Sequence, residues 1–413
     1  MKRSFTGMVL VLLSTKVSYA QYVEYTTRFE VTEINASSPA ANTAKSFAAA
    51  ARMGHVAWVG TPPPAEDSLI QSCVMHTGQS PWPGSCNPYG MVHALYEGQS
   101  GSWAEQIFLD SQQQAAFDSQ VSHLIGTLKS PNVLPIYGHG DHWVINYSIW
   151  KDMDGKVVEF DFYDGGPGGT RDGTNTGYFN GPMMVAPEVW KSVYYKVVTT
   201  IPNTDPYYNK YVNLYEPPGG IEPPVARSDY RRSPSPLQTG TRVTLPLVRD
   251  LARKSLFDAG LTRHQKEWAI LNDSTPMLPF EVFGAYPDGS DWDYYLVPFL
   301  NRRHEIVALA MFERETLRFQ MATVLERPLP FRGYSHDQAR QLAQSSVRSD
   351  ETLGQGILTW DPVATSEHAY SPLAPYYEFD VYRAGQRIGS TLVHIYSGGV
   401  NKLASGQTSR RMR

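Results

Sequence analysis

Hydrophobic and polar residues change from helical to strand-like spacing across residues 86–163. Apolar side chains first recur every three or four positions, which is typical of amphipathic helices. Runs of β-branched and aromatic residues then predict antiparallel strands, with a tight turn at Asp152-Met-Asp-Gly155. The predicted helices cover residues 86–96 and 102–128, and the predicted strands cover 133–137, 142–150 and 156–163. Helices followed by an antiparallel sheet indicate an α+β fold.

Two segments near the C-terminus repeat one pattern of apolar and turn residues. Residues 293–312 and 375–396 each open with Tyr-Tyr, turn at a polar or Gly-containing stretch, and continue into a second apolar strand. Helical spacing precedes each hairpin, at residues 247–259 and 335–345. The sequence therefore predicts two helix-plus-hairpin units, which either arose by a weak duplication or resemble each other by chance.

Composition shifts divide the chain into segments. Residues 202–245 are rich in Pro, Gly and Ser, as linkers are. A strand and an Ala-rich helix are expected before the central segment, either as a propeptide or as part of the fold. The expected segments are 1–20, 21–70, 71–201, the linker 202–245 and the C-terminal region 246–413.

The first twenty residues have the features of a signal peptide. Lys2 and Arg3 precede a short apolar run at residues 8–13. The small residues Ser18 and Ala20 then indicate a cleavage site after Ala20. We therefore expect an exported protein, periplasmic or secreted. The apolar run is too short to span a bilayer, and no later run approaches 18 apolar residues. The net charge is −4, and the sequence has no basic patch that would indicate nucleic-acid binding.

Only two cysteines occur, Cys73 and Cys86, and they allow two interpretations. In an oxidising compartment they can pair, and a disulfide closing so short a loop would stabilise the fold by about 3 kcal/mol. Alternatively, Cys86 is a nucleophile, because it begins a predicted helix whose N-terminal field lowers a thiol pKa. Both interpretations stay open at the level of sequence.

A thiolate nucleophile needs an imidazole, a group that orients it, and donors for the oxyanion. His142 opens a predicted strand and is the imidazole candidate. Asp164 and Asp161, on the next strand, are candidate orienting groups, and Gln79 is a candidate oxyanion donor beside the Cys86 backbone N–H. Each residue also has a structural explanation: a core strand for His142, a turn for Asp164 and a loop amide for Gln79.

This set of motifs resembles papain-like cysteine peptidases, nearest the compact bacteriocin-processing branch. The resemblance lies in Gln79 before Cys86-Asn-Pro88, in Gly-Asp-His142-Trp-Val, and in Asp164-Gly-Gly-Pro. It implies a papain-like domain with a central helix packed on an antiparallel sheet. It also implies Cys86 as nucleophile, His142 as general base and acid, Asp164 as orienting group and Gln79 as oxyanion donor.

A metal site is a competing hypothesis. Tyr137-Gly-His-Gly-Asp-His142 resembles the His-x-His-x-Asp-His ligand run of metallo-β-lactamase-type hydrolases, with Tyr137 in place of the first His. Imidazole and carboxylate groups at this spacing can ligate zinc. The later histidines do not follow the strand pattern that this fold needs, so no metal or other cofactor is expected. His139 is then either a loop residue or a secondary partner of the site.

The leading hypothesis is thus an exported thiol hydrolase that cleaves peptide or amide bonds through a Cys86 thioester. Its partner would be a peptide or protein substrate, and the C-terminal units, which resemble PepSY-like modules, would bind a protein partner or the catalytic domain. A transglutaminase-like acyl transferase is one alternative. The other is a non-catalytic binding or structural protein with a Cys73–Cys86 disulfide.

Overall fold

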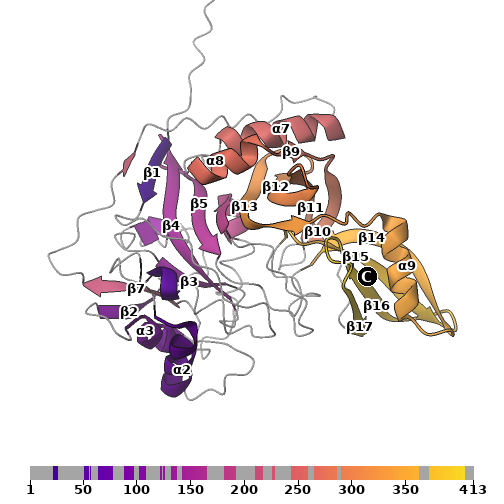
Figure 1. The fold of residues 1–413 in the computed structure, drawn as a ribbon, viewed down its shortest axis with the longest axis horizontal. Coiled ribbons are helices and arrows are strands. Elements are labelled where there is room, and N and C mark those ends of the chain that lie inside the picture. The colour runs from indigo at the N-terminus through magenta and orange to yellow at the C-terminus, as the bar shows by residue number, and fades with distance from the viewer. Residues whose placement is uncertain are drawn as a thin grey trace, which may run out of the picture.

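The computed structural model describes seventeen segments of the chain and shows a mainly β protein (Figure 1). The described residues are 22–26, 51–54, 56, 64–77, 88–96, 102–107, 121–122, 124–125, 132–136, 142–164, 181–191, 210–216, 226–227, 243–258, 265–285, 290–361 and 372–404. The predicted α+β class with a papain-like central helix is therefore wrong, because strands dominate both halves and the helices are short.

In the N-terminal half, the described residues 51–54, 56, 121–122 and 124–125 are helical, and the bounds of eight strands and three further helices are defined. They are β1 (Tyr22–Thr26), α2 (Glu66–Thr77), α3 (Pro88–Tyr96), β2 (Ser102–Ile107), β3 (Asn132–Ile136), β4 (His142–Asp152), β5 (Val157–Asp164), β6 (Gly181–Val185), α5 (Pro187–Val189), β7 (Lys210–Glu216) and β8 (Ala226–Arg227).

The C-terminal half contains nine strands and three helices among its described residues. They are α7 (Leu245–Asp258), α8 (Gln265–Asn272), β9 (Thr275–Pro276), β10 (Phe280–Ala285), β11 (Asp291–Leu300), β12 (Glu305–Glu313), β13 (Phe319–Pro330), α9 (His336–Ser346), β14 (Glu351–Trp360), β15 (Tyr376–Arg383), β16 (Gln386–His394) and β17 (Val400–Ala404).

Three predicted strands of the N-terminal half are confirmed as β3, β4 and β5. The turn between β4 and β5 forms because the Asp152 carboxylate accepts hydrogen bonds from the backbone N–H groups of Asp154 and Lys156, at 3.0 and 2.8 Å. Gly155 completes it at φ +81°, a conformation that favours glycine. Local side-chain chemistry therefore sufficed to predict this hairpin.

Other elements differ from the prediction. The helix expected over residues 102–128 is wrong at its start, where β2 forms and pairs with β7, while the described residues 121–122 and 124–125 are helical. The expected linker 202–245 contains β7 and β8, and β7 pairs with both β2 and β3. Short alternating segments such as β2 and β7 are stabilised by their neighbours across the sheet, which local periodicity does not reveal.

Hydrogen bonding connects the described strands into one sheet. Its main path runs β2-β7-β3-β4-β5-β6-β13-β12-β11-β10-β14-β15-β16-β17. All these pairings are antiparallel except that of β10 with β14. β1 pairs with β4 and β8, and β9 pairs with one end of β11.

Two similar units make up the C-terminal half. Unit 1 comprises α7 and the meander β10–β13, and unit 2 comprises α9 and the meander β14–β17. α7 and α8 cover the strands of unit 1, and α9 covers those of unit 2 (Figure 1). α9 begins with a capping box, in which the Ser335 side chain accepts from Gln338 N–H and the Gln338 side chain accepts from Ser335 N–H.

Apolar side chains fill both faces of unit 1. The near-continuous apolar run of β12 is buried because one face packs on α7 and α8 and the other on a core shared with the N-terminal half. That shared core contains Phe160, Val185 and Trp190 from the N-terminal half and Met311 and Met321 from unit 1. The two halves therefore bury a common apolar surface.

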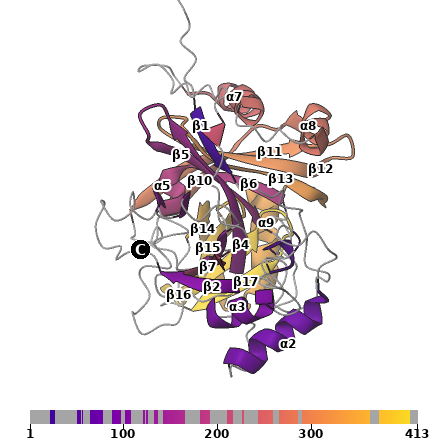
Figure 2. The same ribbon diagram turned by 90° about the vertical axis from the view of Figure 1, so that its left-hand side faces the viewer.

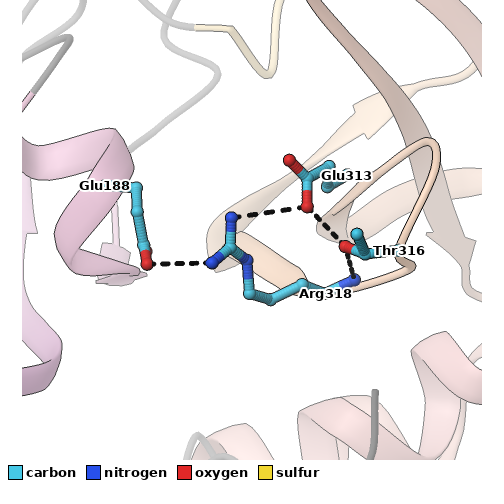
Figure 3. Close-up of polar contacts among 4 residues, drawn as sticks. All are labelled: Glu188, Glu313, Thr316 and Arg318. Carbon is cyan, nitrogen blue, oxygen red and sulfur yellow. Dashed lines mark hydrogen bonds and ion pairs between the residues drawn. The ribbon is translucent and has the colours of Figure 1, made fainter. Parts of the chain in front are cut away.

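The β6–β13 pairing joins the halves, and Arg318 adds an ion-pair bridge beside it. Met321, Ala322 and Thr323 pair with Val185, Met184 and Met183. The Arg318 guanidinium lies 3.0 Å from a Glu188 carboxylate oxygen on α5 and 3.4 Å from one of Glu313 (Figure 3).

Gly284 occupies the point where β10 pairs with β11 on one side and β14 on the other. A Cβ there would lie 2.5 Å from the Trp292 carbonyl oxygen and 3.1 Å from the Tyr294 ring. Gly284→Ala should lower the free energy of unfolding by about 1–3 kcal/mol, because backbone atoms in a sheet cannot yield easily. Urea unfolding measures this, with Gly399→Ala as control, where the new Cβ would meet only the Ser397 hydroxyl at 3.2 Å. Equal stability of the two variants would contradict the packing.

The Arg318–Glu188 ion pair should couple the halves weakly, because both side chains are partly exposed. A double-mutant cycle with Arg318→Ala and Glu188→Ala should give a coupling energy of about 0.2–1 kcal/mol in thermal unfolding. The more exposed Arg302–Asp273 pair, which lies within the C-terminal half, serves as the comparison and should couple less. A coupling of zero for Arg318 and Glu188 would show that the bridge does not hold the joint.

Candidate functional site

His142 and Asp164 lie at the same end of the β4–β5 hairpin. His142 opens β4 and pairs with Ile136 of β3, while Asp164 ends β5 and pairs with Gly181 of β6. The register of Ile145 with Tyr163 fixes this arrangement. Cys86 and Gln79 lie outside the described residues, so the predicted nucleophile, base and oxyanion donor are not brought together by any described contact and stay predictions.

Asp161, the alternative orienting group, is occupied by a structural contact. Its carboxylate is buried and accepts a hydrogen bond of 2.8 Å from the Trp150 indole N–H. Asn146, four residues after His142, is also buried, and its amide donates to the carbonyls of Ser148 and Asp161 at 3.1 and 3.0 Å. These bonds hold the bulge where the β4–β5 register shifts, so both polar residues serve the fold.

The helix pair α2–α3 contains the cysteine that the structure describes. Cys73 lies on α2, is 2% exposed, and is disulfide-bonded. α3 packs on α2 and against β2 and β7, near one end of the sheet. Figure 2 shows the two helices together at the margin of the N-terminal half. A nine-residue helix in this position differs from the long central helix that a papain-like fold requires.

Two histidines stack across the α2–α3 contact. The rings of His76 and His93 lie 3.7 Å apart and nearly parallel, and Tyr89 meets the His93 ring edge-on at 4.6 Å. The Nδ1–H of His76 donates to the Ser72 carbonyl at 2.8 Å. Burial and the neighbouring His76 lower the pKa of His93 below its ordinary value. The folded protein therefore favours the neutral form of the His93 ring.

Exposed apolar side chains lie on the same two helices as this stack. Met75 on α2 and Tyr89 on α3 are 70% and 52% exposed, which is unusual for large side chains. We call Met75, His76, Tyr89 and His93 the α2–α3 surface. Sequence reasoning passed over the two histidines, although His76 follows Cys73 by three residues and His93 follows Tyr89 by four, which are the spacings of neighbours on a helix.

The described part of the chain bears on the metal hypothesis through the placement of its possible ligands. Its residues include no group of three or more His, Cys, Asp or Glu side chains placed to hold a metal ion. The motif of the metal hypothesis, residues 137–142, lies outside the described residues except at His142. Within those same described segments, no helix has the length and apolarity needed to cross a membrane.

Comparisons with known proteins add one weak likeness. No protein-family model and no curated protein matches the sequence. A solved structure of the Bacillus megaterium YpeB C-terminal domain is similar, at 10% identity and a TM-score of 0.17, covering 71% of this chain and 98% of that one. A TM-score this low carries no conclusion about function. The papain-like resemblance is contradicted, since the described residues form one mainly β sheet instead of a helix-centred peptidase domain.

Acidification should loosen the α2–α3 contact. Because the pKa of His93 is lowered in the folded protein, the unfolded chain binds its proton first, and stability present above about pH 6.5 is lost as the pH falls through the lowered value. His76→Gln should raise the pKa of His93 by removing the neighbouring charge, as an NMR titration of the His93 ring would show. His336→Gln, on α9, should leave the titration unchanged. An unaltered His93 titration in His76→Gln would contradict the stacked pair.

Proposed function

We propose that this chain is an exported, non-catalytic binding protein in which a disulfide holds α2 against the start of α3. The observation that carries the proposal is the bonded, buried state of Cys73. The sequence contains one other cysteine, and we propose Cys86 as the partner. It precedes the first residue of α3, Pro88, by two positions, so the bond would tie the entry of α3 to the middle of α2.

This bond is incompatible with thiol catalysis by Cys86. A nucleophilic cysteine reacts as a free thiolate, and a sulfur in a disulfide has no thiolate to offer. The signal-peptide pattern at residues 1–20 supports export into a compartment where disulfides persist. For a loop of about this size, the chain-entropy model gives a stabilisation of the folded protein of roughly 3 kcal/mol. The bond would therefore stabilise the fold whether or not the protein catalyses a reaction.

The α2–α3 surface supports a binding role. Met and aromatic side chains are enriched at protein–protein interfaces, because they bury large areas and adapt to a partner. Met75 and Tyr89 expose such side chains on two helices that the disulfide would hold in fixed geometry. A fixed surface loses less conformational entropy on binding, which favours affinity for a polypeptide partner.

Peptide mapping of the mature protein without reduction tests the proposal. The expected main species is a Cys73–Cys86 linked peptide, and alkylation of the folded protein should label neither cysteine. Cys73→Ser should free Cys86 for alkylation and lower the thermal midpoint, because the loop is no longer closed. Ser72→Ala, which alters a buried hydroxyl next to Cys73, is the matched control and should keep the linked peptide.

The opposite result would restore the catalytic hypothesis. It would consist of a free Cys86 that reacts rapidly with a thiol-directed probe and loses that rate in His142→Ala.

A further inference from the structure

Units 1 and 2 end in equivalent strands, β13 and β17, and this equivalence is visible in the strand register. In unit 1, Tyr294 pairs with Glu313 and Tyr295 with Phe312. In unit 2, Tyr376 pairs with His394 and Tyr377 with Val393. Aligning the two Tyr-Tyr pairs therefore places the residues of β16 on those of β12, one for one.

The pairings of β12 with β13 and of β16 with β17 extend this equivalence to the outer strands. On β12, Met311, Ala310 and Leu309 pair with Met321, Ala322 and Thr323 of β13. The equivalent β16 residues Leu392, Thr391 and Ser390 pair with Asn401, Lys402 and Leu403 of β17. Asn401, Lys402 and Leu403 are therefore the counterparts of Met321, Ala322 and Thr323.

In unit 1 these positions already hold another strand. Met321, Ala322 and Thr323 are the residues that pair with β6 in antiparallel orientation. The Thr323 hydroxyl adds a bond to the Pro182 carbonyl, at 3.1 Å, and the Ala186 N–H donates to the Gln320 carbonyl, at 2.8 Å. In unit 2, within the described segments, β17 pairs with β16 alone.

We propose that the edge of β17 at residues 401–403 binds an extended polypeptide segment of another protein, antiparallel to β17, with an acidic residue opposite Lys402. An open strand edge presents N–H and C=O groups that a further strand can pair with. β6 supplies the pattern for such a strand, and its central residue Met184 lies opposite Ala322, the counterpart of Lys402. Lys402 is exposed, so a carboxylate opposite it would form a favourable cross-strand pair.

Charge argues against a second copy of this chain as the occupant. Two β17 strands paired antiparallel over their full length, Val400–Ala404, would centre on Lys402 and place it opposite its own copy. Like charges directly opposite each other destabilise a strand pair.

Hydrogen exchange of the full mature protein with a synthetic peptide tests this edge. The probe is a soluble peptide containing Gly-Pro-Met-Glu-Val, the β6 sequence with glutamate in place of Met184. We expect the outward amides of residues 400–404 to exchange readily in the free protein and to become protected when the peptide binds. The same peptide with N-methylated Met, Glu and Val amides should not bind, because its backbone donors are removed.

A charge exchange gives the sharper readout by fluorescence polarisation. Lys402→Glu should lower the affinity for the glutamate peptide about threefold. A peptide with lysine at the same position should bind Lys402→Glu more tightly than it binds the unaltered protein. Lys254→Glu, an exposed residue on α7, makes the same change of net charge away from β17 and should leave both affinities unchanged.

Two results would overturn the proposal. One is full protection of residues 400–404 in the free protein, since the chain itself would then cover the edge. The other is peptide binding that ignores N-methylation and the charge exchange. The inference goes beyond the α2–α3 surface proposed above, and its test is separate: a free Cys86 thiol would refute the disulfide proposal while leaving peptide binding at β17 intact, and the converse also holds.

Discussion

The antiparallel pairing of β6 with β13 is the constraint on which the rest of the structure depends. It turns the strands of the N-terminal half and those of unit 1 into one hydrogen-bonded sheet. Phe160, Val185 and Trp190 then share a core with Met311 and Met321, so separating the halves would expose apolar surface on both. The Arg318 bridge to Glu188 lies at the rim of this joint, where solvent screening leaves it a minor contributor.

The parallel contact of β10 with β14 is the second joint, and it places unit 2 at the far end of the sheet. Both units use a helix to cover an antiparallel meander, but their outer strands have different environments. β13 is internal because β6 follows it, whereas β17 has an exposed lysine at the matching position. A lysine is a usual protection for an open strand edge against unspecific pairing. The same lysine would pair favourably with an acidic residue of a partner strand.

Two buried polar residues of the N-terminal half that lie near the predicted site, Asp161 and Asn146, serve the sheet. Asp161 accepts from Trp150, and Asn146 bonds the backbone around a bulge. Cys73 is buried and bonded on a helix pair at the sheet margin. The bonded state of Cys73 is the observation on which the proposed binding role depends.

The sequence by itself determined the elements whose signals are local: the β4–β5 hairpin with its Asp152 and Gly155 turn, the capped helix α9, and the two Tyr-Tyr hairpins. These depend on turn residues, caps and periodicity, which act within a few positions. Only the tertiary structure decided that β2 and β7 are strands, since each is stabilised by partners distant along the chain. The same holds for the His76–His93 stack, whose members lie on separate helices. The prediction of the fold class was wrong for the same reason. Similar local patterns of helices and hairpins occur in a peptidase domain and in one continuous sheet, and long-range strand pairing determines which of the two forms.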